Sequence, residues 1–349
     1  MSPATSIPRK SRLALGVLCA LPACVGPQAP RVTVERVALV MGTSLSMQVS
    51  GPDRASALAA SELALRAVEA TEARLSTWRT DSELSRIFAQ APGTFHPCSS
   101  VLASELGQAA RLAARTAGAF DPTIAPLVAA WDLRGTGRRP HTVNRLRALR
   151  FVDFRRLRVQ AASVSFEPGT RIEEGGFGKG AALDAAQMAL AELHGIEAQL
   201  DLGGQISLSA GAEPRAIPLA HPDQRDVAHL QLELHAGESM ATSANTVKAK
   251  PHPDGIIGHL LNPRSGWPAS DFGSVTVICP KALDADALST ALFVLGPDTG
   301  LNFAESEAGV EAIFLIRAPS GIQVTYTSGL EGRIHPAPGS PMEPLVSTP

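Results

Sequence analysis

The stretch EEGGFGKGAALDAA, residues 173–186, places four glycines and a lysine directly ahead of an alanine-rich run. Backbone N–H groups at a helix start, with no side chains to block approach, favour an anion, and Lys179 adds positive charge beside them. The other interpretation is a glycine-lined helix–strand junction that only packs tightly. The residues of this stretch alone leave both interpretations open.

Two familiar nucleotide-binding loops do not match this stretch. A Walker A loop ends in Gly-Lys-Ser/Thr, whereas here Lys179 is followed by Gly180. A GxGxxA pattern starts at Gly176, but a Rossmann glycine turn follows a buried apolar strand, and the glutamates at 173–174 stand in that place. We therefore expect neither a P-loop fold nor a Rossmann fold.

The elements around this stretch indicate an α+β or mixed α/β domain. Amphipathic spacing predicts helices at 54–75 and 101–116, a third directly after the glycine-rich turn, and a fourth at 284–296. A strand with a bend or a close backbone approach at Gly42 is expected within 31–49. Further strands are expected at 158–169, 275–279, 312–316 and 323–327, and short strands or hairpins at 197–209, 216–219 and 228–235. This order favours mixed sheets flanked by helices. The basic, breaker-rich segment 132–144 is expected to be an exposed loop and the best internal boundary.

Composition excludes some classes of partner. The 349 residues are 44% hydrophobic, which is ample for a buried core, and carry a formal net charge of −2. No sustained positive stripe suited to a phosphate backbone is evident, so nucleic acid is not an expected partner.

The first residues have the pattern of an export signal. Basic residues precede the apolar segment LALGVLCALPAC, which is too short to span a bilayer comfortably. The end of this segment, residues 21–24, resembles a bacterial lipobox. Residues 1–23 are therefore expected to be a lipoprotein signal peptide, and Cys24 the lipidated first residue of the mature protein. The alternative is an ordinary signal peptide that is cleaved nearby. We expect an exported protein of the bacterial cell envelope, lipid-anchored on the periplasmic side of a membrane.

Two cysteines then remain in the body of the chain, Cys98 and Cys279. They would pair in an oxidising compartment if they lie close together, but Cys279 ends the apolar run VTVIC and equally fits an inert core thiol. No CxxC or close His/Cys cluster exists, so a zinc site is not expected.

Two further places offer polar groups for a ligand. Asp286 and Thr290 are four residues apart on the predicted helix 284–296 and therefore point the same way. A carboxylate and a hydroxyl are hard oxygen ligands that suit Mg²⁺, although helix capping by the acid and packing of the threonine are the simpler interpretations. His259 and Arg264 lie in the turn-rich segment HLLNPRSG, and each taken alone is more often a surface residue.

Taken in order, these segments resemble the ApbE family of FAD:protein FMN transferases. The resemblance spans about residues 36–330. It rests on MGTSLSMQV (41–49), LSTWRTDSELSRI (75–87), TAGAFDPTIAPLVAAW (116–131), EEGGFGKGAALD (173–184), LDLGGQIS (200–207), ATSANTVK (241–248), HLLNPRSG (259–266) and VTVICPKALDADALSTALFVLG (275–296).

The resemblance implies an ApbE-like flavin transferase domain over 31–335, with a disordered tail at 336–349. Such a domain binds FAD with Mg²⁺ on its diphosphate and transfers the FMN moiety to a threonine or serine hydroxyl of an acceptor protein, releasing AMP. The compartment implies a membrane redox subunit as that acceptor.

The resemblance also assigns residues to roles. The FAD site is implied to contain Met41, Trp78, Ala119, Phe120, Asp121, Glu173 (where aspartate is more usual), Lys179, His259 and Arg264. The metal is implied to be held by Asp286, Thr290 and the backbone carbonyl of Gly176. Lys179, Asp286 and His259 are the expected catalytic groups, with His259 as base or proton relay and a nearby carboxylate as the alternative base.

The sequence departs from the family pattern at three positions. These changes are expected to affect the strength of FAD binding and the choice of acceptor more than the class of reaction. They are Ala181 for an aromatic residue, Gln205 for aspartate and Ala244 for glycine. Two other functions stay open: an Mg²⁺-dependent FAD pyrophosphatase giving FMN and AMP, and a non-catalytic FAD-binding lipoprotein.

Overall fold

The computed structural model describes residues 31–245, 250–252, 255–338 and 345–347. The described residues all belong to one compact unit, which begins at Arg31. The predicted internal boundary at 132–144 therefore does not divide the domain. The predicted signal peptide and Cys24 lie outside the described residues.

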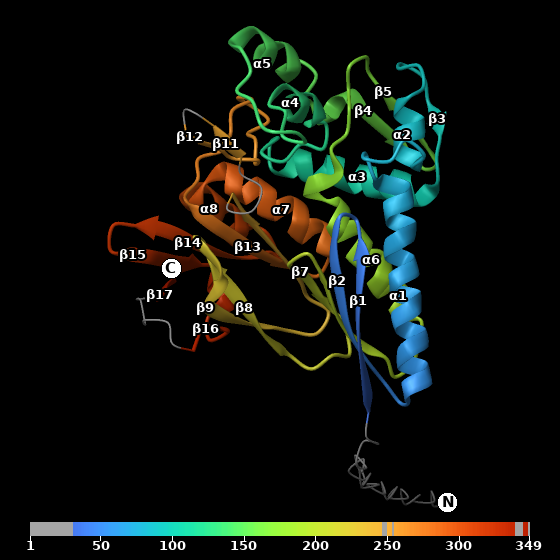
Figure 1. Ribbon diagram of the computed structural model, residues 1–349, viewed down its shortest axis with the longest axis vertical. Helices are drawn as coiled ribbons and strands as arrows, with labels where there is room; N and C mark the ends of the chain where they lie inside the picture. Colours follow the sequence, from blue (N-terminus) through green and yellow to red (C-terminus); the bar gives the residue numbers. More distant parts are fainter. Residues whose placement is uncertain (1–30, 246–249, 253–254, 339–344, 348–349) are drawn as a thin grey trace, which may run out of the picture. The chain divides into compact units, whose positions relative to one another are not determined.

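A nine-stranded sheet forms the centre of this unit (Figure 1). Every neighbouring pair is antiparallel except β15 and β17, which run parallel. In spatial order the strands are β1 (Val32–Val40), β2 (Thr43–Gly51), β6 (Glu197–Leu202), β7 (Gln205–Leu208), β10 (Ser239–Ala244), β13 (Gly273–Cys279), β14 (Glu311–Ala318), β15 (Gly321–Tyr326) and β17 (Leu345–Ser347).

The strand predicted within 31–49 is in fact a hairpin. Val40 pairs with Thr43, so Met41 and Gly42 are the two residues of the turn, with φ angles of 52° and 70°. Two successive positive φ values match the right-handed twist of a two-residue hairpin, which a bend in a single strand would not need. The backbone N–H of Met41 donates to Glu72 Oε1 at 3.1 Å, which fixes the turn against a helix.

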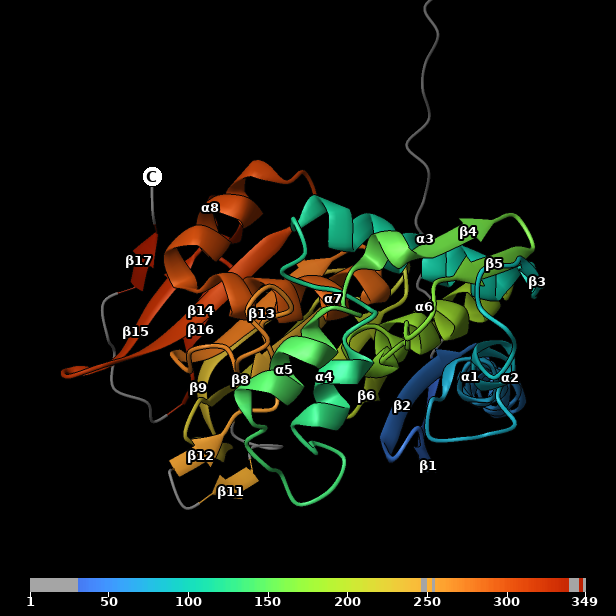
Figure 2. The same ribbon diagram turned by 90° about the horizontal axis from the view of Figure 1, so that it is seen from above.

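Helices cover one face of the sheet (Figure 2): α1 (Arg54–Leu75), α6 (Gly178–Ala191), α7 (Ala282–Leu295) and α8 (Pro297–Ser306). Apolar side chains of α1, α6, β2 and β6 share one core cluster. Helix α7 is buried on nearly every side, as its sequence of alanine, leucine and phenylalanine requires. A carboxylate on this helix, Asp286, is therefore held in an apolar setting.

A second, three-stranded sheet covers part of the opposite face. It consists of β16 (Ile334–Pro336), β9 (Gln224–Leu234) and β8 (Arg215–His221). Leucines and isoleucines of this sheet pack on β7, β13, β14 and β15 in a separate core cluster. The nine-stranded sheet is thus buried on both faces in this region, which positions β8 as a wall facing the ends of β6 and β7.

The remaining elements gather at one end of the domain (Figure 1). The strand predicted at 158–169 is a hairpin of β4 (Leu157–Gln160) and β5 (Ser163–Phe166), because residues 161–162 form a turn. The other elements there are α2 (Glu83–Phe88), β3 (His96–Pro97), α3 (Ser100–Arg115), α4 (Ala125–Ala130), α5 (Thr142–Leu149), the single turns η1 (Phe154–Arg156) and η2 (Glu174–Gly176), β11 (Lys250–His252) and β12 (Gly255–Ile257).

The predicted fold class, a mixed α/β domain that is neither a P-loop nor a Rossmann fold, is confirmed by this topology. Cys98 and Cys279 are both free thiols, and burial raises the pKa of the Cys279 thiol, as expected for an inert core residue. The predicted tail at 336–349 falls partly outside the described residues; within it, 345–347 form β17. No helix in the described part of the chain is long and apolar enough to cross a membrane.

Candidate active site

The glycine-rich turn lets two helices approach more closely than ordinary side chains allow. A methyl group on Gly180 would overlap the backbone carbonyl oxygen of Ala282 and lie 2.6 Å from Leu283 Cα. Helix α7 has no side-chain cap of its own, and Asp184 of α6 supplies one by accepting from Ala282 N at 2.7 Å and from Leu283 N at 3.1 Å. The glycines therefore do serve close packing, but they join α6 to a second helix, α7, and not to a strand.

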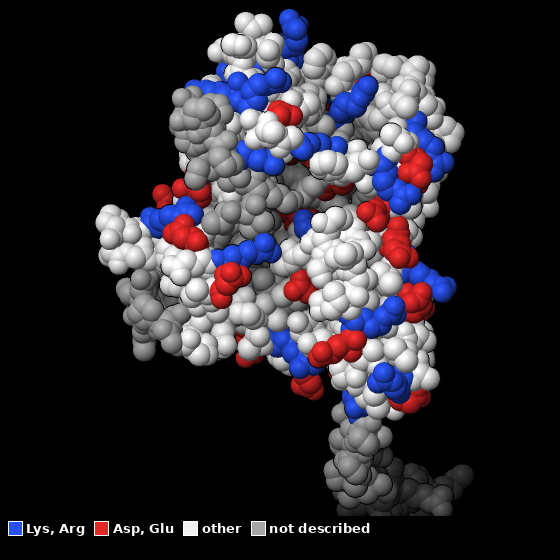
Figure 3. Space-filling view, viewed as in Figure 1, with Lys and Arg blue, Asp and Glu red and all other residues white. Residues whose placement is uncertain are grey.

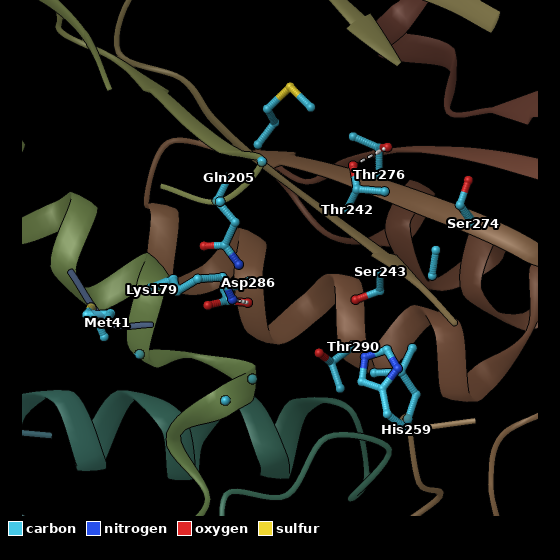
Figure 4. A pocket seen from close by; sticks show the side chains of 18 of the residues that line it. Met41, Lys179, Gln205, Thr242, Ser243, His259, Ser274, Thr276, Asp286 and Thr290 are labelled. Atoms are coloured by element: carbon cyan, nitrogen blue, oxygen red, sulfur yellow. Dashed lines mark hydrogen bonds and ion pairs between the residues drawn. The ribbon is translucent and has the colours of Figure 1, made fainter. Parts of the chain in front are cut away.

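That packing brings the glycine-rich turn against Asp286. The carboxylate is only 5% exposed; its Oδ2 accepts from Gly180 N at 3.1 Å, and its Oδ1 lies 3.9 Å from Lys179 Nζ. Figure 4 shows Lys179 and Asp286 together, with Thr290 further along α7 beside His259. The start of α6 thus already binds one anion, the carboxylate of Asp286, and the ammonium group of Lys179 lies beside it in the cavity.

The oxygen atoms gathered here are of the kinds that a magnesium ion prefers. Thr290 lies one turn beyond Asp286, and a Cβ built on Gly176 would lie 3.5 Å from Thr290 Oγ1, so the backbone of η2 faces the hydroxyl. Carboxylate, hydroxyl and carbonyl oxygens are ligands that Mg²⁺ prefers. Within the described residues no group of three or more His, Cys, Asp or Glu forms a complete metal cage. A cation here would therefore take further oxygens from water or a phosphate, as Mg²⁺ usually does.

These groups line a cavity of about 1430 Å³, which opens in the middle of the face shown in Figure 3. It exceeds the roughly 300–1,000 Å³ typical of small-molecule pockets, so it has room for a ligand as large as a dinucleotide. The predicted residues that the structure brings together in its lining are Met41, Trp78, Ala119, Phe120, Asp121, Glu173, Gly176, Lys179, His259, Asp286 and Thr290.

Arg264 is the predicted site residue that does not line the cavity. Its guanidinium donates to the backbone carbonyl oxygens of Thr116 at 2.9 Å and of Ala117 at 3.1 Å. Cations at the carbonyl end of a helix are favourable, because the last carbonyl groups have no partner within the helix. Arg264 therefore ties the loop that carries His259 to the end of α3.

Asp121 lines the cavity, but its carboxylate is already engaged. It is 5% exposed and accepts hydrogen bonds from the backbone and hydroxyl of Thr123, at 2.8 and 2.6 Å, and from Phe154 N at 2.9 Å. Burial raises the pKa of this carboxyl, whereas these hydrogen bonds act in the opposite direction. Asp121 thus shapes the wall formed by residues 119–124.

At the rim of the cavity, Arg134 joins two predicted site residues, and this contact was not predicted from the sequence. Arg134 donates to Glu173 Oε2 at 2.7 Å, and its guanidinium lies 4.4 Å from the centre of the Trp78 ring. The neighbouring Glu174 is buried and accepts from Thr77 N at 3.1 Å. Burial and the adjacent Glu174 raise the pKa of Glu173, and Arg134 counters both. The paired glutamates and the basic segment 132–144 were the only sequence signals for this cluster.

Trp78 itself is 67% exposed, which is unusual for so large an apolar side chain. Since Trp78 lines the cavity, with a guanidinium stacked against its ring, the indole offers an apolar contact for a planar ring. The position of Trp78 beside a flavin stays a prediction.

Gln205 contributes an unsatisfied polar group to the cavity wall. Its side chain is 5% exposed, and Oε1 has no hydrogen-bond partner among the described residues. Figure 4 shows this carboxamide directed toward Lys179 and Asp286. A buried acceptor without a donor costs free energy, so a ligand N–H or O–H at this place would restore the missing bond.

Comparison with known proteins agrees with this geometry. The profile of the ApbE family matches residues 41–314. The chain belongs to the ApbE family. A protein of Treponema pallidum named FAD:protein FMN transferase is 28% identical, over 88% of this chain and 92% of its own length.

Two solved structures of the ApbE family have the same fold. The apo form of the flavinyl transferase ApbE of Pseudomonas stutzeri has 25% sequence identity and a TM-score of 0.74, covering 87% of this chain and 97% of its own. The ApbE protein of Thermotoga maritima has 25% identity and a TM-score of 0.78, covering 86% and 99%. The resemblance noted from eight sequence segments is thereby confirmed as family membership.

We expect Asp184 to give the stability of this ApbE protein a measurable pH dependence. Burial raises the pKa of Asp184 from 3.8 to about 6, so between these values the folded state binds more protons than the unfolded state. The contribution of Asp184 is therefore most stabilising below pH 3.8 and is lost as pH rises through 6. The test is the free energy of unfolding by urea between pH 4 and 7, for the wild type and Asp184→Asn.

The difference in unfolding free energy, wild type minus Asp184→Asn, should fall between pH 4 and 6 and level off above. Asp298→Asn, which changes an exposed acid in the first turn of α8, is the matched control for the loss of one acid and should not show this fall. A flat difference for Asp184→Asn as well would contradict the prediction.

Proposed function

We propose that this chain is an FAD:protein FMN transferase, which moves the FMN moiety of FAD to a threonine or serine hydroxyl of an acceptor protein and releases AMP. The observation that supports it most directly is the convergence of Lys179, Asp286 and Thr290 on a cavity of dinucleotide size. The Treponema pallidum relative is named FAD:protein FMN transferase.

In this proposal, different residues of the cavity contact different parts of FAD. Trp78 and Met41 form an apolar border for the isoalloxazine ring, while Lys179 projects toward the diphosphate. Lys179 is 24% exposed, so its ammonium group is partly desolvated yet reachable by a ligand. Phosphoryl transfer relies mainly on positioning and on neutralising charge, which is the role we assign to Lys179.

We propose that Asp286, Thr290 and the carbonyl of Gly176 hold Mg²⁺. The ion would neutralise charge on the diphosphate and on the AMP that leaves. Asp286 also holds the surrounding protein groups in place, since its carboxylate accepts a hydrogen bond from Gly180 N and lies beside the ammonium group of Lys179. The acid thus links the metal site to the helix start that carries the lysine.

In the reaction, the acceptor oxygen forms a bond to the FMN phosphorus, and the bond from that phosphorus to the oxygen bridging to AMP breaks. The acceptor hydroxyl loses its proton to a base. His259 lines the cavity beside Thr290, and imidazole titrates near neutral pH, so we assign His259 as this base or as a relay (Figure 4).

His259→Ala should lower FMN transfer by about 10²-fold and flatten the acidic limb of the pH–rate profile, because general base catalysis typically contributes 10²–10⁴-fold. The measurement is the initial rate of AMP release from pH 5.5 to 9. His335→Ala, which removes an exposed imidazole on β16 away from the cavity lining, serves as the matched control and should keep the wild-type rate. Wild-type rates for His259→Ala across this range would refute the assignment.

The proposed function is tested by incubating the protein with FAD, Mg²⁺ and a membrane extract of its source. A fluorescent protein band that survives denaturation, together with AMP, supports transfer. AMP and free FMN without a band identify a pyrophosphatase, because the same site would then admit water to the phosphorus. Neither product identifies a flavin-binding protein.

We further propose that the protein works in the cell envelope, anchored through a lipid on Cys24. The support is the basic and apolar pattern of residues 1–24. Growth with radiolabelled palmitate followed by isolation of the protein tests this, since a Cys24→Ser chain should stay unlabelled.

A further inference from the structure

Arg134 lies at the rim of the cavity and joins two separate segments of the chain. Its guanidinium donates to Glu173 Oε2 at 2.7 Å and lies 3.7 Å from Glu174 Oε2. The same guanidinium donates to the backbone carbonyl oxygen of Thr77 at 3.2 Å and to the Thr77 hydroxyl. A planar group with five N–H donors in a fixed fork can make all these contacts at once. Arg134 therefore fixes residue 77 against the paired glutamates.

The loop that carries Arg134 is a closed turn held against the core. The backbone N–H of Arg138 donates to the carbonyl oxygen of Trp131 at 2.8 Å, which closes the loop at its base. Trp131 is buried, and its indole N–H donates to the carbonyl oxygen of Gly266 at 2.8 Å. The position of Arg134 at the rim is thus set by a packed turn.

The Trp78 side chain is held on one face by this arginine. Its main chain is fixed, because Thr77 N donates to Glu174 Oε1 at 3.1 Å and Trp78 N donates to Ser76 Oγ at 3.3 Å. The guanidinium carbon of Arg134 lies over the indole, 4.4 Å from the ring centre. No other aromatic or cationic side chain in the described part of the chain contacts this ring. Trp78 still lines the cavity and is 67% exposed, so its other face is open to a ligand.

An ion pair that only stabilises the fold would explain part of this arrangement. Glu173 and Glu174 are 16% and 10% exposed, and two adjacent acids in such a setting need a cation. A lysine would meet that need equally well. Ordering an exposed indole, in contrast, costs conformational entropy and buries little surface. The contact between Arg134 and Trp78 therefore favours a function in ligand binding over a function in folding.

An indole that is already ordered improves the binding of a planar ligand. A side chain that becomes immobile only on binding reduces the affinity, and ordering it beforehand removes this cost. FAD has two planar groups, the isoalloxazine and the adenine. The isoalloxazine has three fused rings, so it offers the larger area for an offset stack on an indole.

We infer that Arg134 is a positioning residue for the flavin: its guanidinium holds the Trp78 indole in the orientation that stacks on the isoalloxazine ring. This inference rests on the proposed function, which places Trp78 beside that ring. Arg134 acts through Trp78 and not on the phosphorus. Its replacement should therefore weaken flavin binding and leave the chemical step unchanged.

The first test is Arg134→Lys, which keeps a positive charge for the two glutamates but removes the planar group from the indole. The dissociation constant of riboflavin, measured by its fluorescence, should rise about five-fold, the size expected for a cation–π contact at an exposed site. The affinity for ADP, measured by calorimetry, should stay unchanged. Arg138→Lys changes an exposed arginine of the same turn that does not line the cavity, and it should match the wild type for both ligands.

The other outcomes of this test contradict the inference. Wild-type riboflavin affinity in Arg134→Lys would show that the charge alone matters. An equal loss for riboflavin and ADP would show that the substitution disturbs the whole site, and a loss for ADP alone would place adenine on Trp78. A wild-type protein that does not bind riboflavin would also refute the inference.

A double-mutant cycle tests whether Arg134 acts through Trp78. FAD is the ligand here, because its diphosphate contacts remain when the indole is removed. Arg134→Lys should weaken FAD binding about five-fold in the wild type and not at all in Trp78→Ala, since residues that act as a pair are not additive. The same loss in both backgrounds would contradict the inference.

Turnover separates this inference from the proposed function. Arg134→Lys should form the labelled band about five-fold more slowly when FAD is far below its KM, and at the wild-type rate when FAD is saturating. Wild-type rates at both concentrations would refute the role of Arg134 and leave the transferase function intact. If the binding measurements succeed and neither AMP nor a labelled band forms, the transferase function is wrong and the role of Arg134 stands.

Discussion

Asp286→Asn is expected to lower FMN transfer by about 10²–10³-fold while leaving the fold intact. The amide keeps the shape of the acid and an oxygen that accepts from Gly180 N, but it removes the negative charge beside Lys179 and the anionic ligand of the proposed metal. Loss of one preorganised electrostatic group in an active site typically costs this much. The measurement is AMP release and band formation at saturating FAD and Mg²⁺.

A neighbouring acid provides the control for Asp286→Asn. Asp284 lies on the same helix, does not line the cavity, and accepts from Gln108 Nε2 at 2.6 Å. Asp284→Asn should retain most of the activity, and both variants should melt within a few degrees of the wild type. Full activity of Asp286→Asn would mean that the carboxylate only caps the glycine-rich turn.

The helices and most strands could be predicted because their signals are local. The predicted helices at 54–75 and 101–116 correspond to α1 and α3, and their apolar spacing follows directly from burial of one face. The hairpin of β1 and β2 was missed because its turn begins with Met41, whereas glycine, asparagine or aspartate usually occupies a position of positive φ. The contact with Glu72, which supports this conformation, is not visible locally in the sequence.

In the candidate site, only the residues that belong to recognisable sequence motifs could be predicted. Asp286, Lys179 and Gly176 were named from the family pattern, and the structure brings them together. Arg134 was not named, since nothing in a breaker-rich loop shows that it folds back onto Glu173. The contact of Arg264 with α3 was missed for the same reason: its partners are backbone carbonyls almost 150 residues away.

Gly180→Ala is the second change for which we expect a large effect, and it acts on stability first. The added methyl group would overlap the carbonyl oxygen of Ala282 and lie 2.6 Å from Leu283 Cα, both of them backbone atoms that no rotamer change can move. Helices α6 and α7 must therefore separate, which typically costs about 1–3 kcal/mol for overpacking. Urea denaturation measures this as a fall in the unfolding free energy.

A glycine in another helix provides the control that shows whether the close contact causes the loss of stability. A methyl group on Gly107 of α3 would meet nothing closer than 3.5 Å, so Gly107→Ala should be neutral or stabilise by up to about 1 kcal/mol through helix propensity. Gly180→Ala should also lose FMN transfer even where it remains folded, because the separation moves Gly180 N away from Asp286. Wild-type stability of Gly180→Ala would show that α6 and α7 can shift freely, and the close contact would then not be what positions Lys179 beside Asp286.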